Sequence, residues 1–184
     1  MTVTAPAQTP SIYPETLLDG VTAGRCWWAV YTKARQEKAL ARDLLAREIP
    51  FYLPLVKKTS YYAGRRISFL VPVFSSYVFM YGSQDERVES LTTNRVSRIL
   101  PIPDPDSLRH DLRQLRKLIA SGAPLTVESR LAAGRRVRIK RGLLAGLEGT
   151  VLTRRGETRL LVSVDFLQQG ASVAIEDFLL EPID

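Results

Sequence analysis

The sequence predicts an α+β domain followed by a small all-β barrel of the SH3-like kind. In the first part of the chain, apolar runs typical of strands alternate with segments whose leucines recur at helical spacing. Such an order favours a sandwich of helices and an antiparallel sheet. In the last part, residues 134–184, short segments of period-two alternation follow one another without a helix, which is typical of a small barrel.

The first part contains seven segments with clear signals. We expect, in chain order, a buried strand over 26–32 (CWWAVYT), a helix over 33–48 with Thr32 as its N-cap, a hairpin over 56–71 with Ala63-Gly64-Arg65 at its turn, and an apolar strand over 73–81. A short helix after the capping box of Ser83 and Glu86, an edge strand over 98–102, and a last helix with Leu108, Leu112, Leu115 and Ile119 on one face follow.

The last part opens with a basic strand in which Val137 and Ile139 alternate with cationic residues. A connection that contains Gly146 and Gly149 follows, and we expect both glycines to meet backbone requirements rather than to contact a ligand. The five expected strands span residues 135–140, 149–154, 158–165, 171–176 and 178–182.

These elements divide the chain into four regions. We expect a flexible N-terminal tail over 1–24, a first domain over 25–121, a linker over 122–133 and a second domain over 134–184. The first 20 residues lack a basic start and an apolar core, so we expect no secretory signal. No run of residues is long and apolar enough to predict a membrane span.

The charge is concentrated in the first domain. The chain has 184 residues and a net charge of +7, and residues 25–121 hold 17 Lys and Arg against 9 Asp and Glu. This excess predicts a polyanionic partner, most plausibly nucleic acid, while a basic surface that only aids solubility is the alternative. The single cysteine, Cys26, permits no disulfide within the chain and fits a reducing cytoplasm.

Nothing in the sequence predicts an enzyme. His110 is the only histidine, and neither it nor Cys26 stands beside a partner for nucleophilic catalysis. The sequence contains no motif for a phosphate-binding loop, a metal site or a pair of catalytic carboxylates. We therefore expect no cofactor and no metal.

Three motifs carry a resemblance to a known family. WWAVYTK leads into a basic helix, Phe51-Tyr52-Leu53-Pro54 precedes the basic hairpin, and PVFSSYVFMY follows it. Residues 25–121 resemble the NGN domain of the NusG family of transcription elongation factors. GRRVRIKRGLLAGLEGTV resembles the KOW motif, and residues 134–184 resemble the KOW domain. In detail the chain is similar to specialised RfaH, LoaP and UpxY paralogs. It has Ser75-Ser76 where the family often has Pro-Gly.

The resemblance implies a bacterial, cytoplasmic, monomeric transcription factor that promotes processivity and antitermination. It implies that the β′ clamp helices of RNA polymerase dock in an apolar pocket of Phe74, Tyr77, Phe79 and Ile99. Lys33 matches a position that contacts non-template DNA. On their charge and placement, we expect further contacts with non-template or upstream DNA from Arg35, Lys38, Arg42, Arg65, Arg66 and Arg95.

The resemblance also implies a partner for the second domain. Phe166 and Leu167 match the loop by which such domains bind a small-subunit ribosomal protein, NusE, and another Nus factor is the other choice. Each of these roles competes with a plain structural one: strand residues facing the core, a solvated helix face or a hydrophobic rim. A ribosomal or RNA-binding KOW protein without a polymerase role is the alternative function.

Overall fold

The structure is a computed structural model that describes residues 9–20, 22–129, 134–175 and 180–183. The chain divides into two compact units, which we describe separately. They comprise Met1–Leu53 with Ser75–Ile102, and Pro54–Phe74 with Pro103–Asp184.

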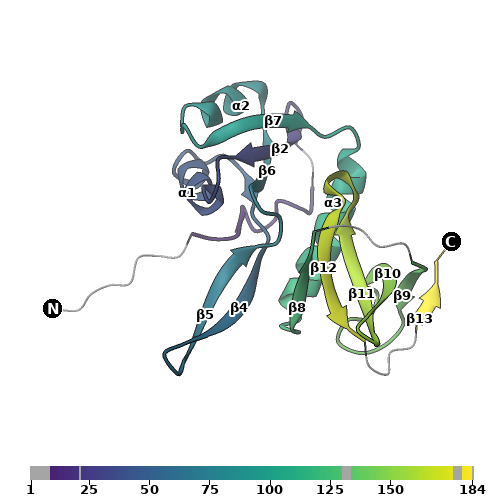
Figure 1. The fold of residues 1–184 in the computed structure, drawn as a ribbon. Coiled ribbons are helices and arrows are strands. Elements are labelled where there is room, and N and C mark those ends of the chain that lie inside the picture. Colours follow the sequence, from purple (N-terminus) through teal and green to yellow (C-terminus); the bar gives the residue numbers. More distant parts are fainter. Residues whose placement is uncertain (1–8, 21, 130–133, 176–179, 184) are drawn as a thin grey trace. The chain divides into compact units, whose positions relative to one another are not determined.

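The first unit is a five-stranded antiparallel sheet with two helices. Figure 1 shows its central strands and both helices. The strands lie in the order β1 (Ile12–Tyr13), β3 (Phe51–Tyr52), β6 (Tyr77–Gly82), β2 (Cys26–Thr32) and β7 (Val96–Pro101). The helices are α1 (Glu37–Ala46) and α2 (Gln84–Leu91). The predicted α+β character of this part is confirmed.

The register decides which side chains share a face of this sheet. Tyr31 lies directly opposite Tyr77 on β6 and Arg98 on β7. Its neighbour Val30 lies opposite Ile99. Directly opposed residues point to the same face and successive residues to opposite faces. Tyr77 and Ile99 therefore lie on different faces.

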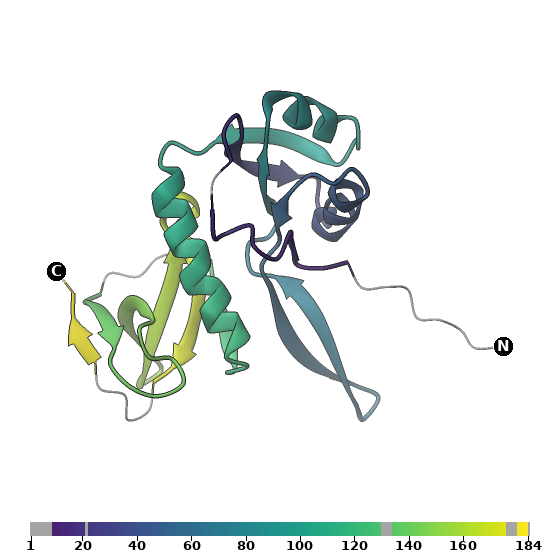
Figure 2. The same ribbon diagram turned by 180° about the vertical axis from the view of Figure 1, so that it is seen from behind.

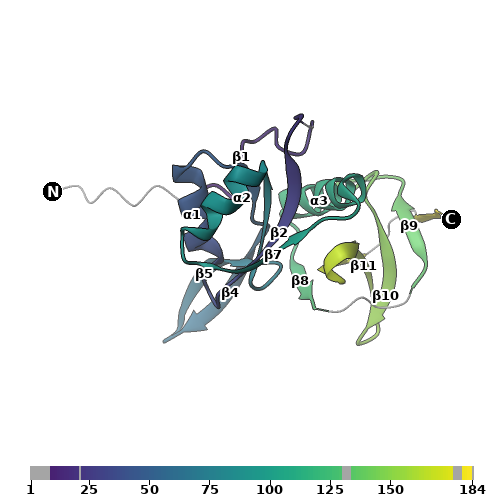
Figure 3. The same cartoon turned by 90° about the horizontal axis from the view of Figure 1, so that it is seen from above.

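Helix α2 covers the Val30 face. The guanidinium of Arg87, on α2, stacks over the Trp28 ring at 5.5 Å from its centroid, and Trp28 shares a face with Val30. Figure 3 shows α1 on the same side of the sheet as α2. The α2 N-terminus has the predicted capping box, in which the Ser83 side chain accepts from the Glu86 backbone and the Glu86 side chain accepts from the Ser83 backbone.

Helix α1 begins four residues later than predicted. Thr32 is not its N-cap: this residue ends β2, and its backbone N–H donates to the Ser76 carbonyl at 2.8 Å. Arg35 has φ +60°, a left-handed conformation that cannot belong to an α-helix. The helix therefore starts at Glu37, and Arg35 does not share a helical face with Lys38 and Arg42.

The expectation of a flexible tail does not hold for residues 9–20. Ile12 and Tyr13 pair with β3 as an added edge strand, and Leu17 and Leu18 are 5% and 1% exposed. The Tyr81 hydroxyl accepts from the Thr22 backbone N–H at 2.6 Å. Proline and threonine content indicated mobility, but the apolar side chains of this segment are buried.

The predicted hairpin is confirmed. Strands β4 (Leu55–Tyr62) and β5 (Arg65–Pro72) form a two-stranded sheet of their own. Ala63 and Gly64 both have positive φ, +48° and +74°, as a two-residue hairpin turn of type I′ requires.

In the second unit, six strands form one antiparallel sheet. They lie in the order β13 (Leu180–Pro182), β9 (Arg136–Ile139), β10 (Glu148–Arg154), β11 (Glu157–Val164), β12 (Gln169–Ala174) and β8 (Leu125–Glu128). The five predicted strands are present, and closure into an SH3-like barrel stays a prediction. Strand β8 lies within the expected linker, because residues 125–128 pair with β12.

Helix α3 (Pro105–Ala120) packs against β11 of this sheet. Figures 1 and 2 show the helix running along the strands. Its buried side chains are Leu108, Leu112, Leu115 and Leu118, so Leu118 takes the place expected for Ile119. The sequence places this helix in the first domain, whereas its leucine stripe puts it with the C-terminal strands.

The N-terminal segment gives a first test of this fold. Leu18→Ala removes a side chain that is 1% exposed, and we expect a loss of about 2–5 kcal/mol in the free energy of unfolding. Thr16→Ala, at an exposed position of the same segment, should change it by less than about 0.5 kcal/mol. Urea denaturation measures both, and equal stability of the two variants would show that the segment is a loose tail.

Candidate functional site

An aromatic cluster lies on the face of the first sheet opposite α2. Tyr31 and Tyr77 meet edge to face with ring centroids 5.1 Å apart. The Arg98 guanidinium lies 5.2 Å from the Tyr31 centroid. Both tyrosines are half-buried and Arg98 is exposed. We call these three residues the tyrosine cluster. It presents ring surface and a cation together, which suits a partner with apolar and acidic groups.

The structure does not bring the four expected pocket residues together. Phe74 and Phe79 are 1% and 0% exposed, so their rings are interior. Tyr77 and Ile99 are each half-buried, but they lie on opposite faces of the sheet. Tyr77 is thus the one member of that set which offers an accessible ring on this face.

Tyr31, which contacts Tyr77, and Arg98, which lies over the Tyr31 ring, are not among the residues predicted from the sequence. Period-two alternation puts Tyr31 on a face with Trp27, but it does not say which strands flank Tyr31. Only the pairing of β2 with both β6 and β7 brings residues 31, 77 and 98 into contact.

The turn before Tyr77 has the shape that the more usual glycine would give it. Ser76 has φ +64°, the left-handed region that glycine enters without steric cost. Its backbone N–H donates to the Glu37 carboxylate at 2.7 Å, and Glu37 is 8% exposed. The buried carboxylate at the start of α1 thereby orients the strand that carries Tyr77.

The expected DNA-contact residues fall into two groups. Arg95 is held by the protein itself, since its guanidinium donates to the Asp43 carboxylate at 2.5 Å and to the Gln36 side chain at 2.6 Å. Lys33 donates to the Asn94 side chain at 2.7 Å and is exposed. The remaining residues, all exposed, are Arg35, Lys38, Arg42, Arg65 and Arg66.

Residues 25–115 match the model of the NusG family, described as transcription termination factor nusG. This segment is therefore similar to the NusG family. The match supports membership of the NusG family and suggests a transcription termination or elongation factor. NusG-family proteins are transcription factors rather than enzymes, and they act with RNA polymerase. No curated protein matches the chain.

The matched segment ends within α3 and leaves out the added strand β1 and all of β8–β13. The tyrosine cluster and the exposed basic residues therefore lie inside the segment that matches the NusG family. Phe166, Leu167 and the two glycines lie outside it. The KOW identity of the C-terminal strands stays a prediction.

At the end of β11, Phe166 and Leu167 belong to a short 3-10 helix, η1 (Asp165–Leu167). Phe166 is 36% exposed, and the exposed Leu143 lies in the β9–β10 connection. Backbone geometry explains Gly146 in that connection and Gly149 in β10. Gly146 has φ +77°, and a Cβ on Gly149 would lie 2.4 Å from the Leu161 carbonyl oxygen.

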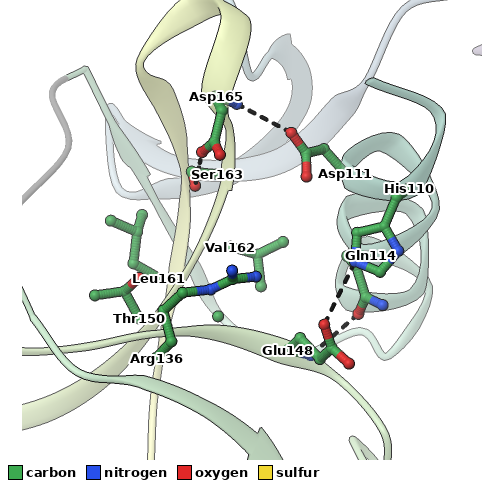
Figure 4. A pocket seen from close by; sticks show the side chains of 11 residues that line it. His110, Asp111, Gln114, Arg136, Glu148, Thr150, Leu161, Val162, Ser163 and Asp165 are labelled. Carbon is green, nitrogen blue, oxygen red and sulfur yellow. Dashed lines mark hydrogen bonds and ion pairs between the residues drawn. The ribbon is translucent and has the colours of Figure 1, made fainter. Parts of the chain in front are cut away.

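Between α3 and the C-terminal sheet lies a polar cavity of about 140 Å³. Figure 4 shows Asp111, Gln114 and His110 of α3 facing residues of the sheet and of η1. Asp111 accepts from the Asp165 backbone N–H at 3.1 Å, and Gln114 accepts from the Glu148 backbone N–H at 3.1 Å. These polar contacts and the leucine stripe together hold α3 on the sheet.

Two carboxylates at this cavity have shifted pKa values in opposite directions. Burial raises the pKa of Asp111 to about 6, with a smaller contribution from the nearby Asp165 charge, against the opposing hydrogen bond from the Asp165 backbone. The Arg138 guanidinium, 2.5 Å from Glu148, lowers the pKa of that carboxyl. Within the described ranges no group of three or more His, Cys, Asp or Glu could hold a metal ion.

None of the helices in the described part of the chain is long and apolar enough to cross a membrane.

Glu37 gives the first test of the site. Glu37→Ala removes the acceptor of the Ser76 N–H, and we expect a loss of about 1.5–3 kcal/mol, the usual cost of a hydrogen bond to a charged group. Glu37→Gln keeps an oxygen acceptor and should lose less. Urea denaturation at neutral pH measures both. Wild-type stability of the alanine variant would show that the carboxylate does not support this turn.

Asp111 gives a pH-dependent test. Because its pKa is raised in the folded protein, the folded state binds the extra proton between about pH 4 and 6, so this group favours folding at low pH and loses that contribution as the pH rises through 6. Asp111→Asn keeps the acceptor without the charge. From pH 5 to pH 8 the free energy of unfolding of the variant should rise by about 1 kcal/mol relative to that of the wild type, after allowance for solvent screening. A constant difference across that range would contradict the assignment.

Proposed function

We propose that this chain is a transcription elongation factor of the NusG and RfaH type, which binds the β′ clamp helices of RNA polymerase and promotes processivity and antitermination. The observation that carries the proposal is the tyrosine cluster of the NusG-like segment. There the ring centroids of Tyr31 and Tyr77 lie 5.1 Å apart, and the exposed Arg98 lies over the Tyr31 ring. Half-buried tyrosines and an arginine are the residue types that dominate the binding energy of protein interfaces.

The proposed docking needs no chemistry. A helical tip placed on the tyrosine cluster buries ring surface, and Arg98 pairs with an acidic group of the tip. Binding that favours the closed clamp over open or swivelled states shifts the population of the polymerase towards the processive form. The rate of pausing and termination falls as a result.

The exposed cations extend the interface to nucleic acid in this proposal. Lys33 and Arg35 lie in the connection between β2 and α1, and Lys38 and Arg42 lie one turn apart on α1. All four are exposed, so phosphates and bases of the non-template strand can reach them. We do not include Arg95 in this interface, because its guanidinium donates to the side chains of Asp43 and Gln36.

The C-terminal strands, which we assign to a KOW domain, recruit a second partner in the same proposal. Phe166 and Leu167 offer apolar surface for a small-subunit ribosomal protein, NusE, or for another Nus factor. A partner held on the same chain gains effective concentration at the polymerase. A specialised paralog acting as a monomer in a bacterial cytoplasm fits this role.

Polymerase binding tests the proposal directly. We expect Tyr77→Ala to weaken binding of core RNA polymerase by about tenfold or more, since it removes an anchor ring. Ile99→Ala, on the opposite face of the same sheet, is the matched control and should bind within about twofold of the wild type. Fluorescence titration measures affinity, and urea denaturation checks that both variants fold.

Equal affinity of the Tyr77 and Ile99 variants would remove the tyrosine cluster from the interface. Failure of the wild-type chain to bind polymerase at all would favour the ribosomal or RNA-binding alternative. Transcription through a terminator, with and without the protein, tests the antitermination activity itself.

The basic residues call for a separate measurement. We expect Lys33→Ala with Arg35→Ala to reduce the affinity for elongation complexes that expose a non-template strand, and to flatten its dependence on salt. Complexes without that strand should bind the variant and the wild type alike. If the double substitution weakens both complexes equally, these residues contact protein rather than DNA.

A further inference from the structure

The β4–β5 hairpin leaves an unusual amount of apolar surface in solvent. Each strand has eight residues, about 26 Å at the usual rise, and no third strand backs the ribbon. Tyr61 and Tyr62 are both 76% exposed, and Ile67, Phe69 and Leu70 are 47%, 44% and 41% exposed. Two-stranded ribbons are marginally stable in water, so such exposure points to a partner.

The register places Tyr61 and Leu70 on one face of the ribbon, and Tyr62, Ile67 and Phe69 on the other. Tyr61 lies opposite Arg66 on one face, and Tyr62 lies opposite Arg65 on the other. Further from the turn, Lys57 pairs with Leu70 on the first face and Lys58 with Phe69 on the second. Each face of the ribbon thus has one tyrosine, one arginine and one lysine, with Leu70 on the first face and both Ile67 and Phe69 on the second.

The charge of the hairpin has a single sign. Residues 55–72 contain Lys57, Lys58, Arg65 and Arg66 and not one Asp or Glu. Within the part of the chain that the structure describes, these four cations form no ion pair. Charge complementarity therefore requires an anionic partner, and the tyrosines require one with flat apolar surfaces.

We infer that the β4–β5 hairpin is a binding site for single-stranded nucleic acid, whose bases stack on Tyr61 and Tyr62 while its phosphates pair with Arg65 and Arg66. Unpaired bases expose the ring faces that tyrosines stack on, and this recognition tolerates any sequence. A duplex hides those faces and offers the hairpin only phosphates and groove edges. An acidic protein would satisfy the cations but would not explain a tyrosine on each face.

The resemblance and charge already suggest DNA contacts for Arg65 and Arg66. This site adds the stacking role of Tyr61 and Tyr62, the preference for single strands, and binding that requires no polymerase. It consists of the hairpin alone and contains no residue of the tyrosine cluster. Single-stranded RNA and single-stranded DNA share the chemistry that the hairpin recognises, so the experiment must distinguish them.

The test measures fluorescence anisotropy of labelled 12-nucleotide oligo(dT), oligo(U) and a 12-base-pair duplex with the full chain. We expect the single strands to bind more tightly than the duplex. Tyr61→Ala with Tyr62→Ala should weaken single-strand binding by about tenfold or more, whereas Tyr61→Phe with Tyr62→Phe, which keeps the stacking rings, should stay within about twofold. Circular dichroism checks that all variants fold.

The arginines have their own readout. Arg65→Ala with Arg66→Ala should reduce the slope of log affinity against log salt by about 1.4, since each phosphate contact on a single strand contributes about 0.7. The tyrosine variants should leave that slope unchanged. A preference for oligo(U) or oligo(dT) identifies the natural strand as RNA or DNA, and either preference supports the site.

Two results would overturn the inference. In one, the alanine variant of the tyrosines binds single strands as well as the wild type. In the other, the duplex binds more tightly than both single strands, which would make the hairpin a groove binder. A pull-down with core polymerase keeps the proposals apart: strand binding without polymerase binding supports the hairpin and contradicts the proposed function, and the reverse result does the opposite.

Discussion

The pairing of β2 between β6 and β7 is the constraint on which the first sheet depends. It places Tyr31 against Tyr77 on one side and Arg98 on the other, and it sends Ile99 to the opposite face. A register slip of one residue would invert every side chain of β2. The buried alternation of this strand resists such a slip, because Val30 and Ala29 are both completely buried. The tyrosine cluster is thus a consequence of core packing.

Ionic contacts separate the cations that stabilise the domain from those that are available to a partner. Arg95 ties the α2–β7 connection to α1 through Asp43, and Arg25 pairs with Glu86 of the α2 capping box at 2.6 Å. The hairpin cations have no such partners in the described structure. Near the helices, the net charge therefore overstates the number of cations that a partner can bind. On the β4–β5 hairpin it understates the local positive charge, because residues 55–72 contain no Asp or Glu.

Two segments extend the structure beyond the outline of the NusG match. Strand β1 pairs with β3 and covers an edge of the first sheet, which protects that edge from unwanted pairing. Helix α3 lies against β11 through its leucines and through Asp111 and Gln114. Burial at this contact raises the pKa of Asp111 to about 6.

The sequence by itself determined the local elements: the strand at 26–32, the hairpin turn at Ala63-Gly64, the capping box at Ser83 and the C-terminal strands. Periodicity and turn chemistry are short-range, so they can be read from neighbours in the chain. Tertiary structure alone decided that β1 joins the sheet, that α1 starts at Glu37, and that Tyr31 lies between Tyr77 and Arg98. These outcomes depend on strand order, register and buried side chains from distant segments, which no local pattern specifies.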